Sequence, residues 1–459
     1  MFAERERRPV FANGVTVAAQ VVWCPVTTSD RSGPTSRGNL RRVALAVFVL
    51  SVAARLVWIA AGEHNFNFVD LRVYYEAAQR VSDGTLYDFA LTDYTPRQPL
   101  PFTYPPFAAL CFYPLKFLPF SVVAVGWVFL TAGLLFLVVR MSLAILAAGR
   151  GAPSRLGDVP VEHALFWTAG ALWIDPVRTN LDYGQINVVL MSLGVWAAYL
   201  VARAESGRPR LVVRPEKVDG ASGALIGIAA GIKLTPAVGG LFLLARGRPW
   251  AAVFSALTFG ATVAISYLLL PSETRRYFTV LLGDTGPIGD PAKPDNQSLR
   301  GAVSRFVGHD VGDGTVWMVS LAVAALLLFA AWWVVRRGDA LIALVLVQLL
   351  GLLGSPISWI HHWVWIVPLL IWVVHGPLGR LGDDRFSGPG KGYTPWSTVV
   401  AATLIVVGLV GVHYTDDVLA SLGLGDGPIW ALLMAQGVAA AAALVALILA
   451  QRRRLQAVV

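Results

Sequence analysis

Charged residues are scarce in this sequence, and cysteine is almost absent. Asp, Glu, Lys and Arg make up 14% of the 459 residues, whereas soluble globular proteins contain about 25%. Such a chain cannot cover its surface with polar groups, which excludes a single water-soluble core. The two cysteines, Cys24 and Cys111, fit no metal-binding spacing. We expect no disulfide between them, because the topology predicted from the basic residues puts them on opposite sides of a membrane.

Hydrophobic residues make up 56% of the chain and occur in long runs. A helix needs about 20 mainly apolar residues to span a membrane. The clear runs are 43–62, 120–148, 184–202, 250–270, 315–335, 395–413 and 428–450, and the shorter or interrupted runs are 163–174, 221–232, 236–245, 340–354 and 362–374. The sequence therefore predicts an all-α polytopic membrane protein with about twelve transmembrane helices.

The two ends of the chain have a different composition. Residues 1–39 contain one short apolar stretch and no signal-peptide core followed by a cleavage site. We expect a mostly disordered cytoplasmic tail over 1–39, a transmembrane domain over 40–451 and a basic cytoplasmic tail over 452–459. A true start codon downstream of residue 1 would explain the composition of the first segment equally well.

The basic residues predict the orientation. Arg37, Arg41 and Arg42 precede the first apolar run, and short cytoplasmic loops are typically rich in Lys and Arg. Further basic residues fall in alternate loops: Arg150, Arg155, Arg203, Arg208, Arg210, Arg214, Lys217, Arg246, Arg248, Arg336, Arg337, Arg380, Arg385 and Lys391, with Arg452, Arg453 and Arg454 at the end. Both termini are therefore predicted to be cytoplasmic. Topology accounts for the net charge of +9, so we expect no nucleic-acid partner.

The opposite face is predicted to carry the long loops 63–119 and 271–314 and short loops around 175–183, 355–361 and 414–427. Asp70 follows the first run closely and is expected at the outer membrane surface, near the start of an interfacial amphipathic helix over 71–81. A second interfacial or re-entrant helix is expected over 108–118. Spacing alone favours an N-cap role for Asp70 over a catalytic one.

Lys233, His361 and His362 are candidate ligands for an anionic substrate. Lys233 interrupts an apolar run, and ionisable residues inside membranes are usually functional. Snorkelling to the surface is the alternative. The two histidines open a helix after Pro356, where a partly unwound start would let both reach one site. They could also be ordinary interfacial polar residues, and no third residue completes a metal site.

Two further polar groups have both a binding and a structural interpretation. They comprise Asn296, Gln297, Ser298 and Arg300 in the second long loop, and Gln185 and Asn187 at the start of a helix. The loop residues are either substrate ligands or a solvated turn. Gln185 and Asn187 either bind sugar or hydrogen-bond between helices.

Several motifs, in this order and spacing, resemble glycosyltransferase family 87. They are the segments 68–74, 84–87, 101–108, 184–187, 231–236, 296–301 and 355–362. The resemblance covers about residues 40–450 and implies a GT-C fold with its active site on the extracytoplasmic face of the plasma membrane. It also implies that Asp70 is the catalytic base, with Arg72, Tyr74, Tyr104 and the polar residues named above as donor or acceptor ligands. Asp175 and Asp182 are second candidates for the base.

The reaction implied by the resemblance is an inverting α-1,2-mannosyl transfer from polyprenyl-phosphate-mannose. It needs one base for the acceptor hydroxyl and positive groups for the departing phosphate. We expect no cofactor and no metal, and we expect a monomer in contact with a lipid-linked donor, a glycolipid acceptor and membrane lipids. The first loop favours extension of phosphatidylinositol tetramannoside to the pentamannoside. Branching of lipomannan remains an alternative. Transport of a lipid or sugar is a less favoured alternative, because transporters typically contain internal repeats and none is found here.

Overall fold

The computed structural model describes residues 34–61, 67–93, 99–149, 155–206, 215–284, 286–312, 314–335 and 339–376. Within these ranges the chain is mostly helical, and the only sheet is an antiparallel pair of two-residue strands, β1 (Ala90–Leu91) and β2 (Leu100–Pro101). The predicted helices at 395–413 and 428–450 and the predicted C-terminal tail lie outside the described residues. So do residues 1–33 of the predicted N-terminal tail.

Four helical segments are long and apolar enough to cross a membrane: Gly38–Ala61 within α1 (Pro34–Ala61), α4 (Phe120–Ala148), α7 (Asn187–Glu205) and α10 (Pro249–Leu269). This confirms a helical membrane protein. α1 begins at Pro34, before the predicted tail boundary at residue 39. Proline is favoured in the first turn of a helix, so the helix can start ahead of the apolar run.

The remaining apolar runs within the described residues also form helices. α13 (Thr315–Val335) and α14 (Ala340–Gly354) begin and end at the predicted residues. α5 (Val161–Ala171) and α15 (Ile366–His375) are shorter than the runs that predicted them. The segment 175–183, expected as a loop, is instead the helix α6 (Asp175–Tyr183), which has a proline in its first turn and ends at Gly184 in the left-handed conformation. These are the usual start and stop signals of a helix.

The predicted break beside Lys233 is present. α8 (Pro215–Ile232) ends there, and the chain continues through the 3₁₀ helix η3 (Thr235–Val238) into α9 (Gly239–Ala245). Upstream of the break, α8 packs closely on α10. A Cβ atom added at Gly227 or Gly231 would lie 2.6 Å from Thr258 Cβ or 2.8 Å from Thr262 Cβ, respectively. Glycines four residues apart share one helix face and allow close approach of membrane helices.

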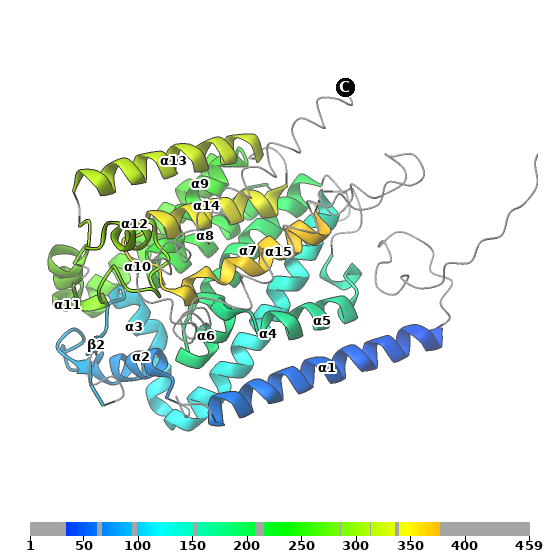
Figure 1. Ribbon diagram of the computed structural model, residues 1–459, viewed down its shortest axis with the longest axis horizontal. Helices are drawn as coiled ribbons and strands as arrows, with labels where there is room; N and C mark the ends of the chain where they lie inside the picture. The colour runs from blue at the N-terminus through cyan, green and yellow to red at the C-terminus, as the bar shows by residue number, and fades with distance from the viewer. Residues whose placement is uncertain are drawn as a thin grey trace, which may run out of the picture.

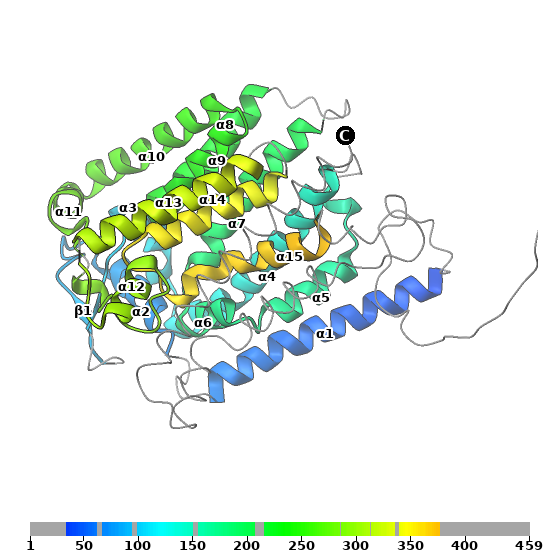
Figure 2. The same cartoon turned by 45° about the horizontal axis from the view of Figure 1, so that its top comes forward.

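The short helices gather at one end of the long-helix bundle (Figure 1). They are α2 (Val69–Arg80), α3 (Pro106–Phe112), α6, α11 (Pro271–Arg276) and α12 (Leu299–Val307). The same grouping is visible after rotation (Figure 2). α1 runs along the edge of the bundle and packs mainly against α5. The two predicted interfacial helices are thus α2 and α3, the second continuing into the 3₁₀ helix η1 (Tyr113–Phe117).

The two ends of the bundle should be accessible from opposite sides of the membrane. Asp83 follows α2 at the end with the short helices, Gly157 precedes α5 at the other end, and both are exposed. In a protein with Cys24 and Cys111 replaced by Ser, a membrane-impermeant maleimide should label Asp83→Cys in intact cells. Gly157→Cys should react only after permeabilisation. Labelling of Gly157→Cys but not Asp83→Cys in intact cells would invert the predicted orientation.

Candidate active site

A cavity of about 860 Å³ lies at the end of the bundle that carries the short helices. Its walls come from the start of α2, the loop at β2, the end of α6, the α8 break and the loop before α15. Its charged and titratable lining residues are Asp70, Asp182, Lys233, Arg276, Asp284, Lys293, Asp295, His361 and His362, and its aromatic ones are Phe68, Tyr74, Tyr87, Phe102, Tyr104, Tyr183, Tyr277 and Trp359. Aromatic surfaces interspersed with charges suit a polar ligand that has apolar faces, such as a sugar.

Asp70 is the second residue of α2 and lines this cavity. The N-cap of α2 is Phe68, so the N-cap interpretation of Asp70 was wrong. Its carboxyl group instead hydrogen-bonds to Gln185. Burial raises the pKa of Asp70 to about 6, although the Gln185 hydrogen bond and the charge of Lys233 both lower it. A carboxyl group with this pKa is ionised at neutral pH and basic enough to accept a proton.

The Gln185 side chain is fixed by three donors. Its Oε1 accepts hydrogen bonds from Tyr74 Oη at 3.0 Å, Tyr104 Oη at 3.2 Å and Asn187 Nδ2 at 3.3 Å. With the oxygen occupied in this way, the amide nitrogen faces Asp70. The two tyrosine hydroxyls also lie 2.9 Å apart, which joins α2 to the loop after β2.

Lys233 carries the positive charge on the other side of Gln185. Its Nζ donates to Asn187 Oδ1 at 3.0 Å, lies 3.0 Å from His362 Nε2 and sits 5.2 Å from the centre of the Tyr104 ring. The ammonium therefore points into the cavity, and the snorkelling interpretation was wrong. His362 Nε2 must be the acceptor in this contact, because an ammonium group only donates.

Both histidines line the cavity, as their motif predicted. They belong to a 3₁₀ helix, η6 (Ile360–Trp365), in which Trp363 has non-helical backbone angles. The predicted unwound start is therefore present, and it allows adjacent side chains to face one space. The ring of His361 packs edge to face on His362, with centroids 4.7 Å apart, and on Tyr183, with centroids 5.7 Å apart.

The predicted loop ligands lie outside the cavity lining. Asn296, Gln297, Ser298 and Arg300 are absent from its walls, as are Arg72 and Asn187. Asn296 is buried and holds the loop before η6: its Nδ2 donates to the Pro356 carbonyl at 3.1 Å, and its Oδ1 accepts from the Ser358 amide at 2.8 Å. Since buried polar groups must be satisfied, the polarity of this segment reflects a structural network.

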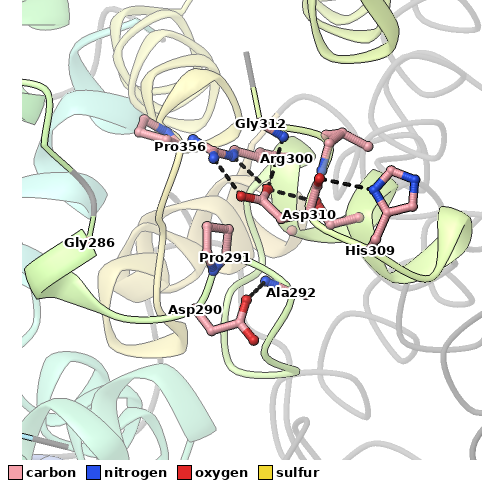
Figure 3. A network of polar contacts seen from close by, with 12 residues as sticks. Gly286, Asp290, Pro291, Ala292, Arg300, His309, Asp310, Gly312 and Pro356 are labelled. Atoms are coloured by element: carbon pink, nitrogen blue, oxygen red, sulfur yellow. Dashed lines mark hydrogen bonds and ion pairs between the residues drawn. The ribbon is translucent and has the colours of Figure 1, made fainter. Parts of the chain in front are cut away.

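The other members of this network have similar structural contacts. Gln297 Nε2 donates to the Pro294 carbonyl at 2.6 Å, and Ser298 Oγ caps α12 by accepting from the Gly301 amide at 3.0 Å. Arg300 forms a two-pronged ion pair with Asp310, at 2.9 and 2.7 Å, which lowers the pKa of that carboxyl (Figure 3). Such bidentate pairs are geometrically specific.

The sequence missed one buried pair beside the cavity. Asp182, a second candidate for the base, lines the cavity but is paired with Arg55 from the last third of α1. Arg55 is 1% exposed, and its position inside a long apolar run was a signal that could have revealed it. Asp175, the other second candidate, is buried against Arg178 outside the cavity lining.

The arrangement brings a proton acceptor and a cation into one space. Asp70 can take a proton from a hydroxyl group, while Lys233 can neutralise a departing anion and the two histidines can hydrogen-bond to it. Among the residues that the structure describes, no group of three His, Cys, Asp or Glu side chains is placed to hold a metal ion. These side chains can supply acid–base and electrostatic catalysis.

Burial of Asp70 should cost stability at neutral pH. Its pKa in the fold, about 6, exceeds the usual 3.8, so stability that is present below about pH 4 is lost as the pH rises through 6. Asp70→Asn should therefore raise the free energy of unfolding at pH 7.5 by at most about 3 kcal/mol, and with it the melting temperature, and should gain less at pH 4.5. Thermal unfolding in detergent measures this, with exposed Asp83→Asn as the control. An unchanged melting temperature at pH 7.5 would contradict it.

Comparison with known proteins identifies the family. The profile of glycosyltransferase family 87 matches residues 102–356. A polyprenol-phosphate-mannose-dependent α-(1-2)-phosphatidylinositol pentamannoside mannosyltransferase of Mycobacterium tuberculosis is 45% identical over 350 residues, which cover 76% of each chain. The enzyme of the same name from Mycolicibacterium smegmatis is 44% identical over 79% of this chain and 83% of its own.

A more distant relative has a less specific name. It is a phosphatidylinositol mannoside mannosyltransferase from Mycobacterium tuberculosis, 30% identical over 71% of this chain and 76% of its own. No solved structure shows a significant match. The extent of the profile match and the identity over three quarters of the chain show that this protein is a membrane glycosyltransferase of family 87.

Proposed function

We propose that the protein is an inverting α-1,2-mannosyltransferase that transfers mannose from polyprenyl-phosphate-mannose to phosphatidylinositol tetramannoside, giving the pentamannoside. The names of the two relatives with 44–45% identity support the donor, the linkage and the class of acceptor. The observation that carries the proposal is that Asp70 and Lys233 line one cavity and are connected through the side chains of Gln185 and Asn187. It supplies both groups that this transfer requires.

The transfer can proceed in a single displacement. The Asp70 carboxylate accepts the proton of the acceptor hydroxyl, and the oxygen attacks the anomeric carbon of the donor mannose from the face opposite the phosphate. The bond between that carbon and the phosphate oxygen breaks, and the electron pair leaves with the phosphate. The contact between Lys233 and His362 at the cavity supports a role for the pair in binding the departing phosphate. An oxocarbenium-like transition state is expected, as in glycoside hydrolysis.

The proposal extends to features beyond the described residues. We propose a GT-C fold with about twelve transmembrane helices, a cytoplasmic tail before the first helix and another over 452–459. The grouping of the short helices at one bundle end supports an extracytoplasmic site at the plasma membrane. We also propose a monomer. Neither metal nor cofactor would be needed if Lys233 neutralises the single phosphate of the donor.

Lipomannan branching is the second candidate. The first candidate is favoured, because the relatives named for the pentamannoside are 44–45% identical to this chain. The relative with the broader name is only 30% identical. Purified protein, radiolabelled polyprenyl-phosphomannose and separate acceptors distinguish the two. Transfer to lipomannan but not to the tetramannoside would overturn the first candidate.

Asp70→Asn should abolish turnover in that assay. The substitution keeps the size of the side chain and its contact with Gln185 but removes the base, for which losses of about 10²–10⁴-fold are typical. Donor binding should persist, and Asp83→Asn should behave as the parent. Near-normal turnover by a folded Asp70→Asn protein would transfer the base role to Asp182, the other candidate carboxylate in the lining.

Lys233→Ala should impair use of the donor more than use of the acceptor. One charge-assisted contact with the phosphate contributes about 1.5–3 kcal/mol, or roughly 10- to 150-fold. Steady-state kinetics with each substrate varied in turn measure the two effects. Lys116→Ala is the matched control, because Lys116 is an interfacial lysine beside Tyr113 and outside the cavity. Equal losses for both substrates would contradict contact with the donor phosphate.

A further inference from the structure

The residue before α2 has an unusual backbone. Phe68 has φ 45° and ψ 51°, and among the described non-glycine residues it alone has a positive φ. A bulky side chain rarely adopts this left-handed conformation. Phe68 is also completely buried. Such strain persists where the surrounding contacts enforce it, and it is concentrated at functional sites.

Gly184 packs closely against Phe68 and Leu71. This glycine has φ 70°, and a Cβ atom added there would lie 2.5 Å from Leu71 Cβ and 3.2 Å from Phe68 Cδ1. The backbone at the end of α6 therefore rests directly on the first turn of α2. Gly184 immediately precedes Gln185, just as Phe68 stands two residues before Asp70. Asp70 and Gln185, which hydrogen-bond to each other, thus lie next to the two sides of the contact between Phe68 and Gly184.

Arg72, four residues after Phe68, stabilises the same first turn of α2. Its Nε donates to the Asn67 carbonyl at 2.7 Å, and its guanidinium lies 4.0 Å from the centre of the Phe120 ring at the start of α4. The Arg72 amide donates to the Phe68 carbonyl at 2.9 Å, which closes the first hydrogen bond of the helix. Arg72 therefore fixes the strained turn to α4 rather than lining the cavity.

We propose that Phe68 and Gly184 are positioning residues, which together set the separation between α2 and Gln185 and so hold the Asp70 carboxyl group in its reactive place. Ordinary core packing would need neither a left-handed phenylalanine nor a glycine backbone pressed against the side chains of the next helix. A misplacement of about 1 Å at a catalytic group can cost about 10²-fold in rate. The inference rests on the proposed base role of Asp70.

Two glycine variants test the proposal. Gly184→Ala adds a methyl group against Leu71, whereas Gly84→Ala adds one at φ 67° with no atom within 4 Å, so both carry the same backbone cost. Gly184→Ala should lower kcat about 10²-fold with the donor KM nearly unchanged. Gly84→Ala should keep the parent kcat. If both variants have the parent kcat, the proposal is overturned.

The pH profile separates positioning from general destabilisation. The acid limb of the kcat/KM profile should report the ionisation of Asp70. Gln185 and Lys233 both lower the pKa of this carboxyl group. Its charge also acts on three nearby tyrosines, Tyr74, Tyr104 and Tyr183. Gly184→Ala should move this limb to higher pH, because the hydrogen bond from Gln185 is weakened. A merely less stable protein would keep the limb in place, which would overturn the proposal.

Phe68→Leu provides a second route if Gly184→Ala does not fold. It keeps an apolar side chain but removes the ring from Gly184, and it should shift the acid limb in the same direction with a smaller loss of kcat. An unshifted limb overturns the proposal. Asp70→Asn measured in parallel distinguishes the failures: turnover by that variant refutes the base role itself. An inactive Asp70→Asn beside a Phe68→Leu variant with the parent limb refutes only the positioning role.

Discussion

The site depends on keeping a carboxylate and an ammonium group charged in one partly buried cavity. Neither charge is stable away from water without polar partners. The Gln185 amide supplies them, since it hydrogen-bonds to Asp70 and also accepts from Asn187, whose own oxygen accepts from Lys233. Among the described residues the two charges are thus connected through amides rather than by a direct ion pair. The proposed roles of the two groups, on acceptor and donor, are compatible with this separation.

The sequence predicted the parts of the fold that depend on hydrophobicity. Apolar runs give helices, so α13 and α14 matched to the residue, and the charge of Lys233 marked a real break. α6 was missed because its helix signals, a proline and a terminal glycine, are equally typical of turns. The distinction depends on the buried contacts of α6 with η6, which no local pattern contains.

The site was predictable where a polar residue had no local explanation. Asp70, Lys233 and the two histidines stood out against apolar surroundings, and the structure places all of them on one cavity. Asn296 and Arg300 stood out equally but bind other parts of the protein, because sequence reveals polarity and not direction. Arg55 shows the converse error: a single charge in a long apolar run was read as part of the run, although it pairs with Asp182.

The glycine face of α8 has a consequence for how this family can diverge. At positions 227 and 231 only hydrogen fits against α10, so the path of the helix that ends at Lys233 is determined by backbone contact. Leu268, elsewhere on α10, is 80% exposed, and a membrane position of this kind requires only an apolar side chain. The packed face and the exposed face of this helix pair should therefore evolve at very different rates.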